Sequence, residues 1–219
     1  MGDGDRLTAL LDEQAAFYQA VASEYDDHAL HFAGGDELTE RLERAIDDFR
    51  PTGRVLELAC GPATWTRQLL RHATDLTAVD ASAEMLRIAA ARVGAAPVRF
   101  ERADLFSWRP DRRYDVVFFG FWLSHVPAER FAPFWSMVSD CLEPDGRVLF
   151  VDDPYRAEEE LIEGADSPVI QRRLTDGTPY RILKIPHRPA DLERRLEELG
   201  WAVTVHANGP FYWGSGGRR

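Results

Sequence analysis

The stretch VLELACGPATWT, residues 55–66, is a short apolar run that leads into a turn holding Gly61. An apolar run ending at a glycine is typical of the first strand of a ligand-binding α/β sheet, because glycine lets the backbone come close to a ligand. A helix expected over 64–72 would offer free N–H groups to the same ligand. A dinucleotide fingerprint has three glycines, whereas this turn has only Gly61. The turn alone therefore does not identify the ligand.

Strands and helices alternate on the C-terminal side of this turn. Apolar runs at 76–80, 98–104, 114–120 and 147–153 are separated by helical patterns. The run at 114–120, YDVVFFG, is nearly continuous, as expected for a strand buried on both faces. The alternation predicts right-handed crossovers and a parallel, doubly wound sheet. The second strand ends in Asp80, where an acid can accept hydrogen bonds from ribose hydroxyls.

The chain is expected to form a single domain over residues 1–219, because 219 residues with 45% apolar content can bury one good core. Residues 54–153 would form the ligand-binding core, and residues 1–50 a helical cap acting as a lid. Residues 154–188 are more charged and are expected to be an irregular insertion or lid. Residues 189–219 would close the fold with a helix and strands.

Composition excludes several classes of function. A net charge of −11 disfavours nucleic acid as a partner, because such binding rests on cationic side chains. No stretch approaches the roughly 20 apolar residues of a membrane span, and the acidic N-terminus lacks the features of a secretory signal. We therefore expect a cytoplasmic protein that binds a small molecule and no membrane. No His, Cys or Asp spacing indicates a metal, and Cys60 and Cys141 are expected to be buried thiols.

Five motifs in order carry a resemblance to a known family. They are VLELACG, VDASAEML, ADLF, YDVVFFGFWLSHV and LEPDGRVLFVD. In order and spacing they resemble the class I S-adenosylmethionine (SAM) dependent methyltransferases, over about residues 54–153. The resemblance implies a Rossmann-like α/β fold, with a seven-stranded, mostly parallel sheet, an antiparallel C-terminal strand and a lid of N-terminal helices. It implies SAM as cofactor, S-adenosylhomocysteine (SAH) as product, and no metal.

The first motif departs from the family pattern of an acid followed by three glycines. Glu57 matches the acid and Gly61 the middle glycine, while Ala59 and Ala63 replace the other two. Alanine keeps the close approach only if these positions do not need a positive φ. SAM carries no phosphate, so a wide glycine loop is dispensable and Glu57 is tolerable beside the cationic methionine end.

The resemblance also implies the cofactor-binding residues. Glu57, Ala59 and Gly61 would line the methionine end of SAM, with the backbone of Phe119 or Gly120 at its amino group. Asp80 would hold the ribose, Ala81 and Met85 would pack on adenine, and Asp104 and Leu105 would bind its edge. An aromatic residue of the first helix, Tyr25 or Tyr18, would cover the cofactor, and Trp65 would form part of the wall of the site. Asp80 and Asp104 could instead cap the segments that follow them, and the two tyrosines could be packing residues.

His125, just after the fourth strand, is the main candidate for a catalytic role. Histidine titrates near neutral pH, so it could act as a general base, orient the substrate or be structural. His28, His31 and His187 are weaker candidates. Phe121 and Trp122 would suit an aromatic acceptor, and Tyr18 would stand on the same side. Arg172 and Arg181, with Arg173 and Lys184, could instead bind a carboxylate or be solvated surface.

The sequence therefore predicts a SAM-dependent methyltransferase that modifies an O or N atom of a small, aromatic or heteroaromatic metabolite. Abundant alanine and a single lysine, Lys184, suggest a bacterial genome rich in GC, and we expect a role in specialised metabolism. A peptide-terminus or tRNA methyltransferase, a SAM- or SAH-binding protein without catalysis, and a nicotinamide oxidoreductase are the alternatives. An open acceptor pocket would favour the enzyme, and a pocket plugged by Phe121 or Trp122 would favour the binder. The sequence leaves the choice between monomer and homodimer open.

Overall fold

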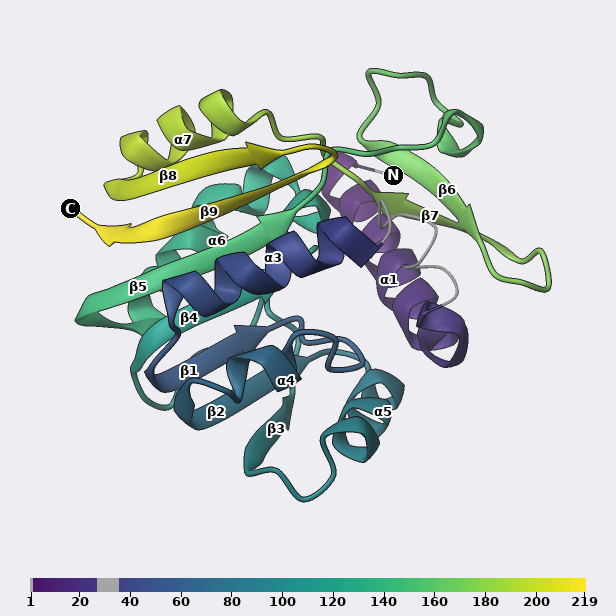
Figure 1. Ribbon diagram of the computed structural model, residues 1–219. Coiled ribbons are helices and arrows are strands. Elements are labelled where there is room, and N and C mark those ends of the chain that lie inside the picture. Colours follow the sequence, from purple (N-terminus) through teal and green to yellow (C-terminus); the bar gives the residue numbers. More distant parts are fainter. Residues whose placement is uncertain (1, 27–35) are drawn as a thin grey trace.

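The computed structural model describes residues 2–26 and 36–219, and the predicted α/β fold is confirmed. Seven strands form one sheet in the order β3-β2-β1-β4-β5-β9-β8 (Figure 1). The strands are β1 (Gly53–Leu58), β2 (Ala73–Asp80), β3 (Val98–Arg102), β4 (Tyr114–Gly120), β5 (Leu142–Asp152), β8 (Trp201–Asn208) and β9 (Phe211–Arg218). β9 runs antiparallel to both of its neighbours, and the pairs from β3 through β5 are parallel.

The helices cover both faces of this sheet. They are α3 (Asp36–Phe49), α4 (Thr66–Leu69), α5 (Ala83–Val93), α6 (Ala128–Cys141) and α7 (Pro189–Glu198). Alternate residues of β4 point to opposite faces, as the two-residue period of a strand requires. Val116 and Phe118 pack in the cluster that includes Leu42 and Ile46 of α3, whereas Val117 and Phe119 pack with the side chains of α6. The continuous apolar run at 114–120 thus serves two cores at once.

A third apolar cluster forms a cap beside the sheet, at the end where α1 lies (Figure 1). The cap consists of α1 (Asp3–Ala20), the short helix η1 (Val21–Glu24) and a hairpin of β6 (Val169–Arg173) and β7 (Pro179–Leu183). Phe17 and Val21 pack there with Ile170 and Ile182. Because the carboxyl ends of parallel strands meet at one edge of the sheet, this cap faces the turns that follow β1, β2 and β4.

Two local expectations differ from the structure. The helix expected over 64–72 is a single turn, α4, because residues 61–65 form a turn before it. The segment 154–188, expected to be irregular, contains the short helix η3 (Glu158–Glu160) and the β6–β7 hairpin. The hairpin gave no clear period in the sequence because its apolar partner is α1, far away along the chain. Within the described part of the chain, none of the helices has the length and apolarity to cross a bilayer.

Gly214 of β9 tests how closely the antiparallel strand packs against a side chain of its neighbour, β5. It pairs with Phe150 of β5, and an added Cβ would collide with the Phe150 ring, which stacks on Phe119. We predict that Gly214→Ala lowers the free energy of unfolding by about 1–3 kcal/mol, the usual range for overpacking. Urea unfolding measures this.

Phe150→Leu should reduce the cost of Gly214→Ala in the double variant, because the smaller side chain leaves room for the methyl group. Ser215→Ala, one residue along β9, is the matched control and should change the stability by no more than about 0.5 kcal/mol. Equal costs of Gly214→Ala in the wild-type and Phe150→Leu backgrounds would contradict this account.

Candidate active site

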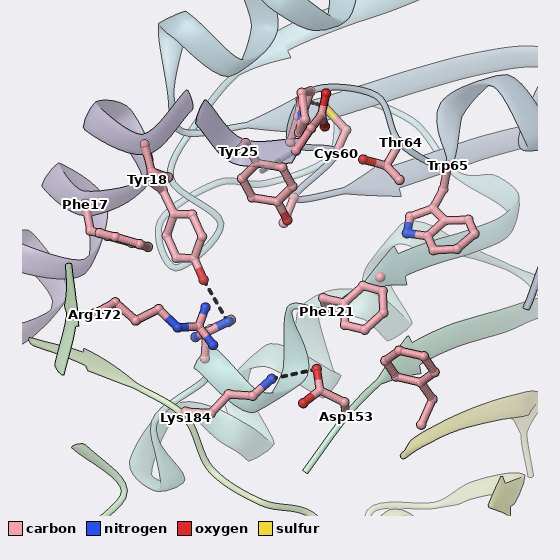
Figure 2. A pocket seen from close by; sticks show the side chains of 18 of the residues that line it. Phe17, Tyr18, Tyr25, Cys60, Thr64, Trp65, Phe121, Asp153, Arg172 and Lys184 are labelled. Carbon is pink, nitrogen blue, oxygen red and sulfur yellow. Dashed lines mark hydrogen bonds and ion pairs between the residues drawn. The ribbon is translucent and has the colours of Figure 1, made fainter. Parts of the chain in front are cut away.

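Two adjoining cavities lie between the cap and the carboxyl edge of the sheet. The larger cavity, of about 460 Å³, extends from the turn after β1 to β6 and Phe211, and Figure 2 shows its lining. The smaller cavity, of about 400 Å³, extends from α1 to the turns after β2 and β3. The residues that line both cavities are Tyr18, Tyr25, Ala59, Gly61, Gly120, Phe121 and His125. These seven residues mark the junction at which a group could pass from one ligand to another.

Asp80 organises the polar side of the smaller cavity. Its Oδ2 accepts a hydrogen bond from Gly61 N–H at 2.8 Å, and its Oδ1 accepts one from Ser82 N–H at 2.8 Å. One carboxylate therefore joins the turn after β1 to the turn after β2. Burial raises the pKa of the Asp80 carboxyl, although both backbone donors act against this rise.

The backbone at the turn after β1 is unusual for alanine. Ala59 has a φ of 51° and Ala63 a φ of 69°, in the region that favours glycine. Both positions do need a positive φ, so alanine is not a free replacement for glycine here. Each alanine costs about 1–2 kcal/mol relative to right-handed backbone. Phe121, at the junction, also has a positive φ of 57°. Ala59 and Phe121 line both cavities, so part of the backbone strain lies at the site, as it commonly does at functional sites.

His125 is held in one protonation state by its neighbours. Its Nδ1 lies 2.5 Å from the carbonyl oxygen of Leu183, and its Nε2 lies 2.9 Å from the Tyr18 hydroxyl. A carbonyl can only accept, so Nδ1 carries the hydrogen and Nε2 accepts from Tyr18. Burial and the nearby Lys184 and Arg172 charges hold the pKa of His125 well below its usual value. The imidazole is therefore neutral at physiological pH.

Two cations line the larger cavity, the buried Lys184 and the partly buried Arg172, and both have acidic partners. Lys184 Nζ lies 3.0 Å from Asp153 Oδ2, which also lines the cavity (Figure 2), and 3.4 Å from Asp152 Oδ1. Arg172 Nε donates to Glu160 Oε1 at 3.0 Å. Trp65, Phe121 and Phe211 line the cavity as well, with Trp65 stacked on Phe121 at 6.3 Å between ring centroids. The larger cavity therefore has a charged end and an aromatic end.

Comparison with known proteins identifies the family. Residues 55–146 match the family model described as a methyltransferase domain. Trans-aconitate 2-methyltransferase of Streptomyces avermitilis is 32% identical over 197 residues, which cover 84% of this chain and 69% of that protein. The chain belongs to the class I SAM-dependent methyltransferases.

Two solved structures of DhpI agree with this assignment over almost the whole chain. The DhpI–SAH complex is 38% identical, with a TM-score of 0.76, and the match covers 96% of this chain and 98% of that one. The DhpI–SAM–HEP complex is 39% identical, with a TM-score of 0.77, and the match covers 94% and 96%. The cofactor of this methyltransferase is SAM.

The smaller cavity of the methyltransferase suits the nucleoside end of SAM. Its lining includes five residues expected from the sequence at that end: Asp80, Ala81, Met85, Asp104 and Leu105. Two carboxylates and an apolar Met85 side chain match the hydroxyl-rich ribose and the flat, apolar faces of adenine. Asp104 also accepts from Phe106 N–H, so it caps its turn as well. The binding roles of these residues stay predictions.

Other expected site residues lie elsewhere. Trp65 and Arg172 line the larger cavity, and Trp122 lines the smaller one. Glu57 and Phe119 are buried in the protein core and line neither cavity, and Arg181 forms an exposed ion pair with Glu13. His187 also lines neither cavity, and His28 and His31 lie outside the described residues.

Several residues that line the cavities were not predicted from the sequence. They include Gln14, Phe106 and Arg130 in the smaller cavity, and Phe17 and Asp153 in the larger one. Asp153 could have been found, because it directly follows β5 at the carboxyl edge, where ligands bind in such sheets. The others come from helices or remote loops and carry no local signal. Across residues 2–26 and 36–219, no group of three or more His, Cys, Asp or Glu side chains could hold a metal ion.

Glu57 yields a prediction about pH. Burial raises the pKa of its carboxyl to about 8, although Thr66 Oγ1 donates to it at 2.6 Å. Between an unfolded pKa of about 4.3 and the folded value, the folded protein holds one more proton than the unfolded chain. The free energy of unfolding should therefore fall as pH rises through this window, by up to about 1.4 kcal/mol per pH unit.

Glu57→Gln should remove this contribution, because the amide does not titrate and its oxygen can still accept from Thr66. Urea unfolding of the cofactor-free protein at pH 5.5 and pH 7.5 measures the effect, with the wild type losing more stability than the variant. Parallel pH profiles of the two proteins would show that Glu57 is ionised in the folded state.

Proposed function

We propose that this methyltransferase modifies an oxygen atom of a small organic acid that is already ionised at neutral pH. SAM supplies a methyl group on a sulfonium; transfer to the acid oxygen forms one C–O bond, breaks one C–S bond, and leaves SAH and an ester. Because the attacking oxygen carries no proton, the enzyme has none to remove. The task of the chain is then to align the acceptor and to exclude water.

The observation that carries the proposal is the state of His125. Both of its ring nitrogens have partners, Leu183 O and the Tyr18 hydroxyl, and its pKa is depressed by burial and by two cations. A neutral imidazole with a low pKa is a poor proton acceptor. A phenol or an alcohol would need such an acceptor, whereas an ionised acid does not. The geometry therefore argues against His125 as a general base.

The charged end of the larger cavity supports an anionic acceptor over a neutral heteroaromatic amine. Arg172 lines this cavity beside Tyr18 (Figure 2), and its charge also acts on His125. A guanidinium favours carboxylate and related oxyanions through charge-assisted hydrogen bonds. Trp65, Phe121 and Phe211 would hold an apolar body of the acid, so the aromatic acceptor expected from the sequence stays a prediction about that body.

Two further observations bear on the acceptor. The relative from Streptomyces avermitilis is named for trans-aconitate, which is a carboxylic acid. The larger cavity also includes the turn at Cys60, Gly61 and Pro62, where the methionine end of SAM is expected, so only part of its volume would remain for the acceptor. This favours a small acid over a peptide terminus. The role in bacterial specialised metabolism stays a prediction.

A panel of acceptors tests the proposal directly. Small carboxylic and phosphonic acids, phenols and heteroaromatic amines are incubated with the enzyme and SAM, and products are identified by mass spectrometry together with release of SAH. We expect methyl esters of one or more acids, at a rate that stays constant as pH falls from 8 to 6. Methylation of phenols or amines in preference to all acids would refute the acid acceptor.

Substitution of Arg172 tests whether this side chain binds the acid. Arg172→Met should raise the KM for the acid by about 10- to 100-fold, the equivalent of a hydrogen bond to a charged group worth about 1.5–3 kcal/mol. Steady-state kinetics measure this. Arg173→Met, one residue along β6 and bonded to Gly177 O and Gln171, is the matched control and should leave KM within about 2-fold.

Removing Arg172 leaves Glu160 buried without this partner, so the single variant risks unfolding. Arg172→Met combined with Glu160→Gln avoids a lone buried charge and should show the same rise in KM. An unchanged KM in the folded double variant would show that Arg172 does not bind the acceptor.

A further inference from the structure

The buried side chain of Gln14 connects two backbone segments that face each other across the cap. Its Oε1 accepts a hydrogen bond from Leu183 N–H at 3.0 Å, and its Nε2 donates to His125 O at 3.4 Å. An N–H can only donate and a carbonyl can only accept, so these partners fix the orientation of the amide. One side chain of α1 thereby holds β7 against the loop that carries His125.

The hydrogen bonds of Gln14 continue through His125 to Tyr18. Leu183, whose N–H is bonded to Gln14, accepts from His125 Nδ1 through its own carbonyl oxygen. His125 Nε2 then accepts from the hydroxyl of Tyr18, which lies one helical turn after Gln14 on α1. We call these four residues the Gln14 network. With the imidazole neutral, each hydrogen bond in it has one possible direction, so the network has a single proton arrangement.

This arrangement determines what the Tyr18 hydroxyl can do. Its hydrogen is committed to His125, so the remaining electron pairs of the oxygen can only accept. Tyr18 lines both cavities, at the junction where the sulfonium methyl group would face the acceptor. Methyl hydrogens next to a positive sulfur are weak hydrogen-bond donors, and an oxygen acceptor beside them favours one alignment.

We propose that Gln14 is a positioning residue for methyl transfer, which acts through His125 to hold the Tyr18 oxygen as an acceptor beside the transferring methyl group. The inference rests on the proposed function of the same site. It assigns Tyr18 the contact with the reacting atoms, and Gln14 and His125 the support of that contact. In this account a neutral His125 is needed to accept the hydrogen bond of Tyr18, and it does not need to act as a base.

Docking of α1 does not by itself explain the Gln14 network. The same helix is tied to the same strand by Glu13, which accepts from Arg181 N–H and from its guanidinium, and by Phe17 against Tyr180. Apolar packing of Phe17 and Val21 on Ile170 and Ile182 adds to this. Docking alone needs no chain of buried polar groups, because burying a polar group costs free energy that its hydrogen bond only offsets. Gln14, Tyr18 and His125 nevertheless line the cavities. Alignment of the Tyr18 hydroxyl accounts for this placement, whereas docking does not.

Gln14→Leu and Glu13→Ala make a matched pair for the test. Both remove ties between α1 and β7, but only Gln14 belongs to the network, and Glu13 lines neither cavity. With an acid found in the panel as acceptor, Gln14→Leu should lower kcat about 10-fold. Glu13→Ala should leave kcat and the Kd for SAH within about 2-fold. Equal losses of kcat in the two variants would overturn the proposal.

A double-mutant cycle separates positioning from a general structural role. Tyr18→Phe removes the hydroxyl and should itself lower kcat. In that background, Gln14→Leu should change kcat by less than about 2-fold, because no hydroxyl is left to align. If Gln14→Leu costs the same factor with and without the hydroxyl, it acts by another route and the inference is wrong.

A spectroscopic readout distinguishes failure of this inference from failure of the acid acceptor. Nitrogen-15 NMR of the histidine rings, recorded with SAH bound, should show wild-type His125 as a single neutral form protonated at Nδ1. Gln14→Leu should show a second tautomer or ring protonation, and Glu13→Ala should not. An unchanged His125 signal in Gln14→Leu overturns the inference. A changed signal together with a panel in which no acid reacts supports the Gln14 network and rejects the acid.

Discussion

The Asp80 carboxylate is the constraint on which the cofactor side of this enzyme depends. The turns after β1 and β2 each present a backbone N–H that needs a partner, and one carboxylate serves both, at Gly61 and at Ser82. Burial without such bonds would be expensive for the charge and for the donors alike. The bonds hold the turn after β1 in the conformation that places Ala59 and Gly61 on the wall of both cavities. The positive φ of Ala59 and Ala63 is tolerated within this frame.

The part of the site expected to hold the acceptor, here called the acceptor side, lies around Lys184 and Arg172. Each of these two positive charges has an acidic partner. Lys184 lies between Asp152 and Asp153, and Arg172 pairs with Glu160. Their positive charges still act on His125, whose pKa they help to depress. The same cations that would attract an acid therefore also keep the imidazole neutral. The proposed ionised acceptor and a neutral His125 are therefore consistent with each other.

The fold was largely predictable because its signals are local. Apolar runs at 55–59, 76–80 and 114–120 match β1, β2 and β4, and the expected antiparallel strand at the C-terminus is β9. Prediction failed where an element depends on a remote partner. The β6–β7 hairpin has short, charged strands, and only residues such as Ile170 and Ile182 pack against α1. Alanine in the turn after β1 gave no sign of its backbone conformation, because composition does not reveal φ.

The sheet, the turn at Gly61 and the acid at Asp80 could be inferred from the sequence alone, since each depends on residues close together in the chain. The acceptor side depends on tertiary contacts, because there Gln14 and Tyr18 of α1 meet His125 and Leu183 from more than a hundred residues away. Hydrogen bonds between remote side chains and backbone groups follow no period in the sequence. The protonation state of His125 is one result, because burial and charges from other segments set it.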